Sequence, residues 1–159
     1  MNSKPESLSI NEIETRFRSN YPAYQYHFVE FITEHLCDCS RAFDGDLQEL
    51  LVLAIVGQMH LKALIDTQSI TSGLPRAKQD QPQISASRIA DASGIPRETV
   101  RRKLVKLADR GWVRKGPAGA WHIVLGEHGT KARDGLSDLD SRAIARMAGL
   151  YARLQGLLR

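Results

Sequence analysis

ISASRIADASGIPRETVRRKLVKL, residues 84–107, is the stretch that decides the fold. Ser85 is placed to cap a short helix whose inward face carries Ile89 and Ala90. Gly94 then allows a tight turn, because glycine accepts the left-handed backbone that a Cβ resists. The first half of the stretch therefore predicts a short helix followed by a sharp turn.

A second helix follows this turn. Pro96 fits its start, where the missing N–H costs nothing and the fixed φ favours the helix. Val100, Leu104 and Leu107 are spaced by four and three residues, so they fall on one buried face. Two short helices joined in this way predict a helix-turn-helix. The alternative is an ordinary amphipathic helical hairpin whose basic face is only solvated.

The charge of the chain is distributed unevenly. The whole chain has a formal net charge of +4, with 42% hydrophobic and 25% charged residues, as in an ordinary globular protein. Residues 1–66 contain five Lys or Arg and ten Asp or Glu, whereas residues 84–115 contain nine basic and three acidic residues. Positive charge concentrated on a helix-turn-helix favours a partner with a phosphate backbone, namely double-stranded DNA.

The second helix carries the candidate base-reading residues. A helix of this kind can lie in the major groove with its N-terminal residues at base edges, where Arg pairs with guanine and Thr contacts a methyl group or a phosphate. We expect this role for Arg97, Thr99, Arg101 and Arg102, and we expect Arg102 to be oriented by a pair with Glu98. Contacts to phosphate or water are expected from the remaining basic side chains of the two helices, Arg88, Lys103 and Lys106.

A small wing is expected after the second helix, which ends at Gly111. Residues 112–115 (WVRK) and 120–125 (AWHIVL) favour two short strands, joined by a tight loop at 116–119 (GPAG). Arg114 and Lys115 are expected to reach DNA phosphates from this hairpin. The alternative is a hairpin that only closes the edge of the domain.

The region before the helix-turn-helix contains the most apolar part of the chain. Residues 37–46 (CDCSRAFDGD) break the helical pattern and predict a loop, at the end of which Asp46 can cap a helix. Residues 47–65 are apolar on all sides, which predicts a helix buried on several sides, and the polar residues within it favour a core helix over a membrane span.

The N-terminal region is rich in aromatic residues. Residues 1–20 are compatible with a short amphipathic helix or with an arm that orders on a partner, and the next helix is expected to begin after Pro22. Tyr24, Phe28 and Phe31 indicate either a packed helix face or a pocket for a small-molecule effector.

The C-terminal segment is expected to form one long amphipathic helix from about Leu136. Its apolar residues alternate steps of three and four and need a partner: Leu136, Leu139, Ala143, Met147, Leu150, Leu154 and Leu157. The partner is helix 47–65 of the same chain, the same helix of a second chain, or both, and we favour a homodimer.

The expected architecture is mostly α with a small β-wing: a winged helix-turn-helix with N- and C-terminal dimerisation helices. The expected parts are an N-terminal arm (1–24), a helical dimerisation or core segment (25–66), a linker (67–83), the winged helix-turn-helix (84–126) and a C-terminal dimerisation helix (127–159).

This order of elements resembles the MarR-type winged-helix regulators. The residues that carry the resemblance are SRIADASGIPRETVRRKLVKLADRGWV (87–113) and VLGEHGTKARDGL (124–136). The second segment is similar to that family's Leu-Thr-x-x-Gly start of the dimerisation helix, with Gly126 where Thr is usual. The resemblance implies a dimeric transcriptional regulator with an effector pocket near the DNA-binding lobe.

The sequence favours no catalytic activity. It contains no phosphate-binding Gly-rich loop, no G-x-S-x-G and no H-E-x-x-H, so we expect no enzyme, no cofactor and no metal. Cys37 and Cys39 are two residues apart and indicate ordinary reduced cysteines, a redox switch or, with His35 and Asp38, a metal site. The polar N-terminus lacks an apolar signal core, so a cytoplasmic protein without a membrane segment is expected.

These features predict a transcription regulator that binds a pseudo-palindromic DNA site as a homodimer, and control by a small-molecule effector is a further expectation. One alternative is a winged-helix adaptor that binds protein partners without sequence-specific DNA contacts. Another is an accessory domain of an enzyme.

Overall fold

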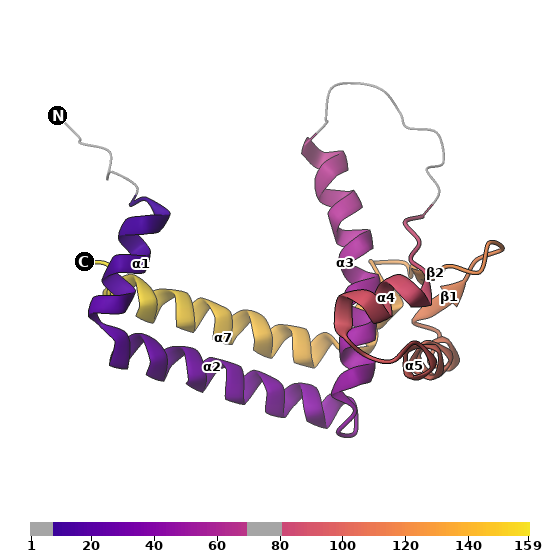
Figure 1. The fold of residues 1–159 in the computed structure, drawn as a ribbon, viewed down its shortest axis with the longest axis horizontal. Coiled ribbons are helices and arrows are strands. Elements are labelled where there is room, and N and C mark those ends of the chain that lie inside the picture. Colours follow the sequence, from indigo (N-terminus) through magenta and orange to yellow (C-terminus); the bar gives the residue numbers. More distant parts are fainter. Residues whose placement is uncertain (1–7, 70–80) are drawn as a thin grey trace. The chain divides into compact units, whose positions relative to one another are not determined.

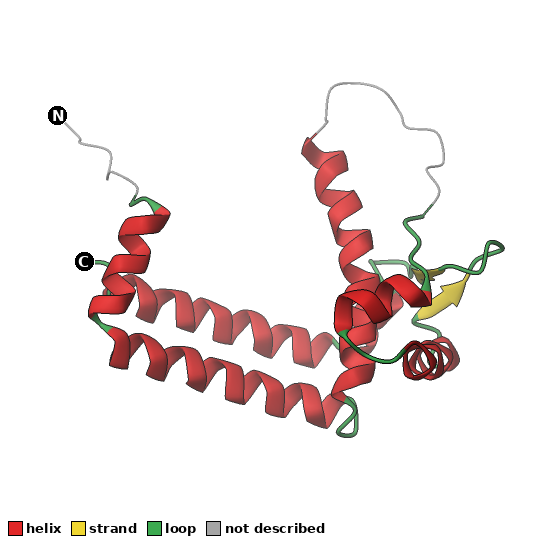
Figure 2. Cartoon of the chain, in the orientation of Figure 1, coloured by secondary structure: helices red, strands yellow, loops and turns green. Residues whose placement is uncertain are grey.

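A computed structural model of the chain describes residues 8–69 and 81–159. The described chain is mostly helical with one two-stranded sheet (Figure 2). Its elements in chain order are α1 (Ile10–Ser19), α2 (Tyr21–Ala42), α3 (Leu47–Ser69), α4 (Ala86–Ser93), α5 (Arg97–Asp109), β1 (Val113–Lys115), β2 (Trp121–Ile123), α6 (Lys131–Gly135) and α7 (Ser137–Gly156). Most of the expected linker at 67–83 lies outside the described residues.

The chain divides into two compact units. One, the helical unit, comprises the chain up to Asp38 together with Asp138–Arg159; the other, the winged-helix unit, comprises Cys39–Ser137. The predicted mostly α fold with a small β-wing is confirmed, since a helix-turn-helix and an antiparallel wing both form within the second unit.

The core of the winged-helix unit is formed by the inward faces of α4 and α5 together with α3. Ile89 of α4 and three residues of α5, Val100, Leu104 and Leu107, are fully buried, as the apolar spacing predicted. The first half of α3 completes this core with Val52, Leu53 and Val56. Burying these side chains against one another fixes how α5 is presented to solvent.

The wing is a short antiparallel hairpin. Val113 pairs with Ile123, Arg114 with His122 and Lys115 with Trp121. Ile84, just before α4, adds a bridge to this sheet, exchanging two backbone hydrogen bonds of 2.8 Å with Trp121. The sequence did not predict this bridge, which attaches the start of the helix-turn-helix to the wing.

The helical unit consists mainly of α2 and α7, which lie side by side and run antiparallel (Figure 1). Three acidic residues of α2 pair with arginines of α7 along the pair: Glu30 with Arg153, Glu34 with Arg146, and Asp38 with both Arg142 and Arg146. The N-terminal region forms the helix α1, one of the two predicted possibilities, and a capping box between Ser9 and Glu12 begins it.

The boundaries of α2 correct two expectations. The helix begins at Tyr21, so that Pro22 lies in its first turn, where no N–H is needed. It continues to Ala42, so the loop predicted for residues 37–46 is reduced to the turn at 43–46. The break comes only at Asp44 and Gly45, both with positive φ, because nothing before them opposes a helix.

The expectation that helix 47–65 is buried on several sides is wrong for its second half. Over residues 47–66, the part of α3 whose side chains are described, buried residues occur only up to Val56, whereas Leu61, Leu64 and Ile65 are exposed in the single chain. The apolar pattern of a helix does not distinguish a surface buried within the chain from one left uncovered. By length and composition α3 is also the one described helix that could cross a membrane, which is weak evidence because core helices of soluble proteins meet the same criterion.

Candidate nucleic-acid interface

The turn between α4 and α5 is fixed by its own hydrogen bonds. Gly94 adopts a left-handed backbone with a φ of 70°, and its N–H donates to Ala90 O at 2.9 Å. The Ser93 hydroxyl donates to Ile89 O at 2.7 Å and accepts from the N–H of Ile95 at 3.2 Å. These hydrogen bonds within the turn therefore fix the start of α5. In a helix-turn-helix, this N-terminal end of the second helix is the end that enters the major groove.

The candidate base-reading arginines lie at the surface of α5. Arg97, Arg101 and Arg102 are exposed, and Arg102 Nη2 lies 3.3 Å from Thr99 Oγ1. Glu98 pairs with Arg101 at 3.5 Å instead of the expected Arg102. Because such exposed pairs contribute little free energy, both guanidinium groups can exchange their present partners for a ligand.

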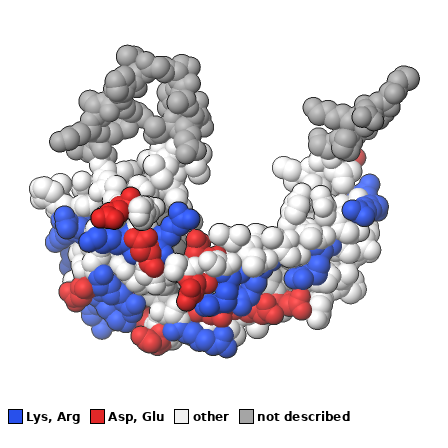
Figure 3. Space-filling model, turned by 180° about the vertical axis from the view of Figure 1, so that it is seen from behind, with Lys and Arg blue, Asp and Glu red and all other residues white. Residues whose placement is uncertain are grey.

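The outward face of α5 carries charges of both signs. A shallow groove on it has a volume of about 360 Å³, and its lining residues are Glu98, Arg101, Arg102, Val105, Lys106 and Asp109. Figure 3 shows Lys and Arg interspersed with Asp and Glu over the visible face of the winged-helix unit. The concentration of positive charge in the sequence is therefore partly offset in three dimensions by acidic residues.

Three basic side chains of α5 and its C-cap turn toward α3, a feature that sequence reasoning missed. Lys106 Nζ lies 2.6 Å from Glu49 Oε2, and Arg110 Nε lies 3.0 Å from Glu49 Oε1. Lys103 Nζ lies 2.6 Å from Asp46 Oδ2. The sequence did contain a signal for these pairs. Glu49 is the single acidic residue among the apolar residues of 47–56, and the helix-turn-helix has an excess of basic residues that could pair with it.

Hydrogen bonds set the ionisation in this cluster. The hydrogen bond to Glu49 raises the pKa of Lys106 above its ordinary value. Burial alone raises the pKa of Asp46, but hydrogen bonds from Lys103 and from the N–H of Glu49 leave it below its ordinary value. That N–H also confirms Asp46 as the N-cap of α3, since it donates to Asp46 Oδ1 at 3.0 Å. Asp46 and Lys106 are thus charged at neutral pH.

The remaining candidate phosphate contacts are exposed. Arg88 lies at the surface of α4, and Arg114 and Lys115 lie at the surface of β1. Lys115 Nζ sits 5.9 Å from the ring centre of Trp121, so part of its position is set by that ring. Across the wing from Arg114, burial and the arginine's charge lower the pKa of His122, which favours neutral imidazole.

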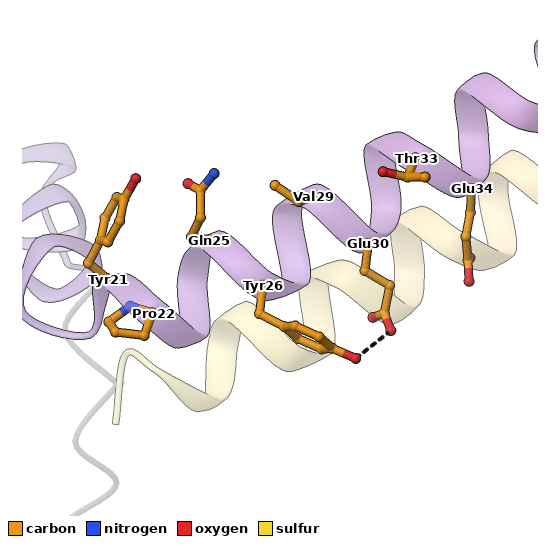
Figure 4. A pocket seen from close by; sticks show the side chains of 8 residues that line it. All are labelled: Tyr21, Pro22, Gln25, Tyr26, Val29, Glu30, Thr33 and Glu34. Atoms are coloured by element: carbon orange, nitrogen blue, oxygen red, sulfur yellow. Dashed lines mark hydrogen bonds between the residues drawn. The ribbon is translucent and has the colours of Figure 1, made fainter.

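The aromatic residues proposed for an effector pocket pack against one another. The ring of Tyr24 stacks between Phe17 and Phe28, at centroid distances of 5.1 and 5.9 Å, and Phe31 is buried. An open groove of about 670 Å³ does lie on α2, lined by Tyr21, Pro22, Gln25, Tyr26, Val29, Glu30, Thr33 and Glu34. Figure 4 shows Tyr21, Gln25, Val29 and Thr33 pointing to one side of the helix and Tyr26, Glu30 and Glu34 to the other. Tyr24, Phe28 and Phe31 are not part of its lining.

The two cysteines belong to α2 and are not joined in a disulfide. Cys37 is exposed and Cys39 is buried, as expected for positions two apart on a helix. The loop assumed for a redox switch is therefore absent at these positions. Within residues 8–69 and 81–159, no group of three His, Cys, Asp or Glu side chains is arranged to hold a metal ion.

Comparison with known proteins gives one match. Residues 72–117 match the IclR helix-turn-helix domain, a segment that includes α4, α5 and β1. No curated protein and no solved structure matches the chain. The match supports a helix-turn-helix regulator without favouring the MarR type. Together with the geometry of α4, α5 and the wing, it shows that this chain carries a helix-turn-helix DNA-binding domain of a transcription regulator.

Proposed function

We propose that this protein binds DNA sequence-specifically as a homodimer, on a pseudo-palindromic site, and regulates transcription there. The observation that carries the proposal is the exposed arginine group at the N-terminal half of α5, Arg97, Arg101 and Arg102, backed by a fully buried core. Arginine guanidinium groups at the N-terminal end of a recognition helix can each donate two hydrogen bonds to one guanine base. A protein-binding adaptor has no need of such donors there.

We assign the other contacts by position. Thr99 lies beside Arg102 and is a candidate for a thymine methyl or phosphate contact. Arg88, Arg114 and Lys115 are candidates for phosphate contacts, which position a protein on the duplex without reading sequence. Lys106 is left out of this group because its ammonium is held by Glu49.

Exposed apolar side chains in the helical unit support the homodimer. Among its described residues only Phe31, Asp38, Leu139 and Leu150 are buried. Large exposed side chains on α2 and α7 include Tyr21, Tyr26, Val29, Ile144, Met147 and Tyr151. Two helices with so little core are not stable alone in water, and a second copy would bury these side chains in a four-helix arrangement. Self-association would also bring two recognition helices to two half-sites.

The proposal extends to the order of elements, an effector and a cytoplasmic location. The MarR-like order of elements, with dimerisation helices before and after the wing, fits the homodimer. An effector and a cytoplasmic location are consistent with a regulator, and the groove on α2 is as well suited to a partner helix as to a small molecule.

Substitution of the arginines tests base reading directly. We expect Arg101→Ala and Arg102→Ala each to lose about 5- to 150-fold in affinity for the preferred site, the effect of about 1–3 kcal/mol per base contact, with little change on unrelated duplexes. Arg114→Ala should weaken binding to both duplexes about equally and reduce the salt slope by about one. Arg159→Ala removes the same charge from the helical unit and serves as the control.

Equal losses on every duplex for Arg101→Ala and Arg102→Ala would contradict base reading by these residues. Absence of binding to any duplex by the unaltered protein would favour the adaptor function.

A further inference from the structure

The acidic cluster at the start of α3 determines which basic side chains of α5 remain available. Glu49 is fully buried, and both of its carboxylate oxygens have a cationic partner, Lys106 and Arg110. Lys106 Nζ also lies 3.6 Å from a second carboxylate oxygen, Asp46 Oδ2. A buried carboxylate is costly unless it is paired, so the free energy of the folded unit depends on keeping these cations in place.

Arg110 is held by more than its charge. Its guanidinium carbon lies 5.0 Å from the centre of the Trp112 ring and 5.7 Å from that of Phe43. The two rings pack edge to face, with their centres 6.1 Å apart, and the guanidinium group lies close to both rings. Lys106 lacks such a support: its side chain is 48% exposed and its stem is flexible. Lys106 is therefore restrained mainly by Glu49, at 2.6 Å, and less closely by Asp46, at 3.6 Å.

The pairing changes the charge that α5 presents. The outward face contains two arginines, Arg101 and Arg102, and two acidic residues, Glu98 and Asp109. Lys106 also lines the groove on this face, but its ammonium lies 2.6 Å from Glu49 Oε2. Non-specific DNA affinity grows with the number of phosphates that a protein neutralises. Lys106 stands on the same helix, one turn or so after the arginines, and would add a phosphate contact if its ammonium were free.

We propose that Glu49 is a specificity-determining positioning residue: by holding Lys106 against α3 it keeps this cation from the phosphate backbone and limits sequence-independent binding. This inference rests on the proposed DNA-binding function. Glu49 itself touches no DNA; it acts through Lys106, and it raises the ratio of specific to non-specific affinity.

Glu49→Gln tests the proposal, because it keeps the shape of the side chain and removes its charge. We expect tighter binding to random-sequence duplex and a salt slope steeper by about one, which amounts to about a 4-fold larger loss of affinity between 50 and 200 mM salt. Asp109→Asn is the matched control, since it removes one exposed negative charge from α5 without releasing Lys106 from Glu49. The proposal predicts a smaller change in slope for Asp109→Asn, and equal changes in the two variants would overturn it.

Lys106→Gln gives a second, independent measurement. In the unaltered protein we expect no change in the salt slope; in the Glu49→Gln background we expect the added slope to disappear, the non-additivity that marks coupled residues. A slope that falls by about one for Lys106→Gln alone would show a phosphate contact in the unaltered protein and overturn the proposal, even where Glu49→Gln does not fold. Failure of the unaltered protein to bind any duplex would instead contradict the proposed function, on which the inference rests.

Discussion

At the scale of single residues, Gly94 carries the turn on which the helix-turn-helix depends. Its φ of 70° is a conformation that a residue with a Cβ adopts only at a cost, while the space around it is open. We expect Gly94→Ala to lower the free energy of unfolding by about 1 kcal/mol through the backbone alone. The measurement is the denaturant midpoint of the whole chain.

Gly57→Ala is the matched control for this substitution. Gly57 lies within α3, and a Cβ added there also meets nothing within 4 Å. Alanine favours a helix interior over glycine by about 0.5–1 kcal/mol, so this variant should be more stable than the unaltered protein. If Gly94→Ala proved as stable as Gly57→Ala, the left-handed turn would not be the constraint described here.

Helix caps and turns were predictable from the sequence where they are made by residues close together in the chain. The cap at Ser85, the turn at Gly94 and the cap at Asp46 depend on neighbours within a few positions, and the structure has all three. The Lys106–Glu49 pair joins residues 57 positions apart and could not be read from spacing. The Glu98–Arg101 pair is decided by rotamers, which a helical pattern does not specify.

At the scale of elements, Asp38 links α2 to α7. Its Oδ2 lies 2.8 Å from Arg142 Nε and 2.5 Å from Arg146 Nη1. These hydrogen bonds, that from Arg146 first, lower the pKa of Asp38 to about 2. A carboxyl group whose pKa is lowered by folding stabilises the folded state above its unfolded value of 3.8, and this contribution is lost as the pH falls from about 4 to about 2.

Asp38→Asn should therefore flatten the dependence of unfolding free energy on pH across that window. Chemical denaturation at a series of pH values between 5 and about 2 measures it. Asp91→Asn, at an exposed position of α4, serves as the control and should leave the profile unchanged. A profile for Asp38→Asn identical to that of the unaltered protein would contradict a stabilising role for this pair.

Element boundaries were predictable where glycine or proline marks them. The ends of α4 and α5 coincide with Gly94 and Gly111, both of which have positive φ, and the wing loop lies at 116–119 as expected. The end of α2 was misplaced because Asp38 and the cysteines resemble loop residues in isolation. In the structure Asp38 is paired with Arg142, 104 positions away along the chain, and Cys39 is buried.

At the scale of the whole molecule, the exposed apolar side chains of α2 and α7 predict self-association. Val29 is 45% exposed and lies in the groove on α2. We expect Val29→Glu to convert a dimer into a monomer, because a buried, unpaired carboxylate opposes the interface. Sedimentation of the purified chain over a range of concentrations measures this.

Ala92→Glu adds the same charge at an exposed position of α4 and should leave the dimer intact. Monomeric behaviour of the unaltered protein at all concentrations would contradict the homodimer, and a dimer unaffected by Val29→Glu would place the interface elsewhere. The sequence indicated that α7 needs a partner, but its periodicity could not separate the face used within the chain from the faces left exposed, because both are apolar.

The measurement that tests the central claim most directly is selection of bound sequences from a random duplex pool at two salt concentrations. The account predicts enrichment of an inverted repeat, with half-sites one helical turn or a multiple of it apart, and affinity that falls steeply with salt. Salt-sensitive binding without any enriched motif, or no binding at either concentration, would contradict it.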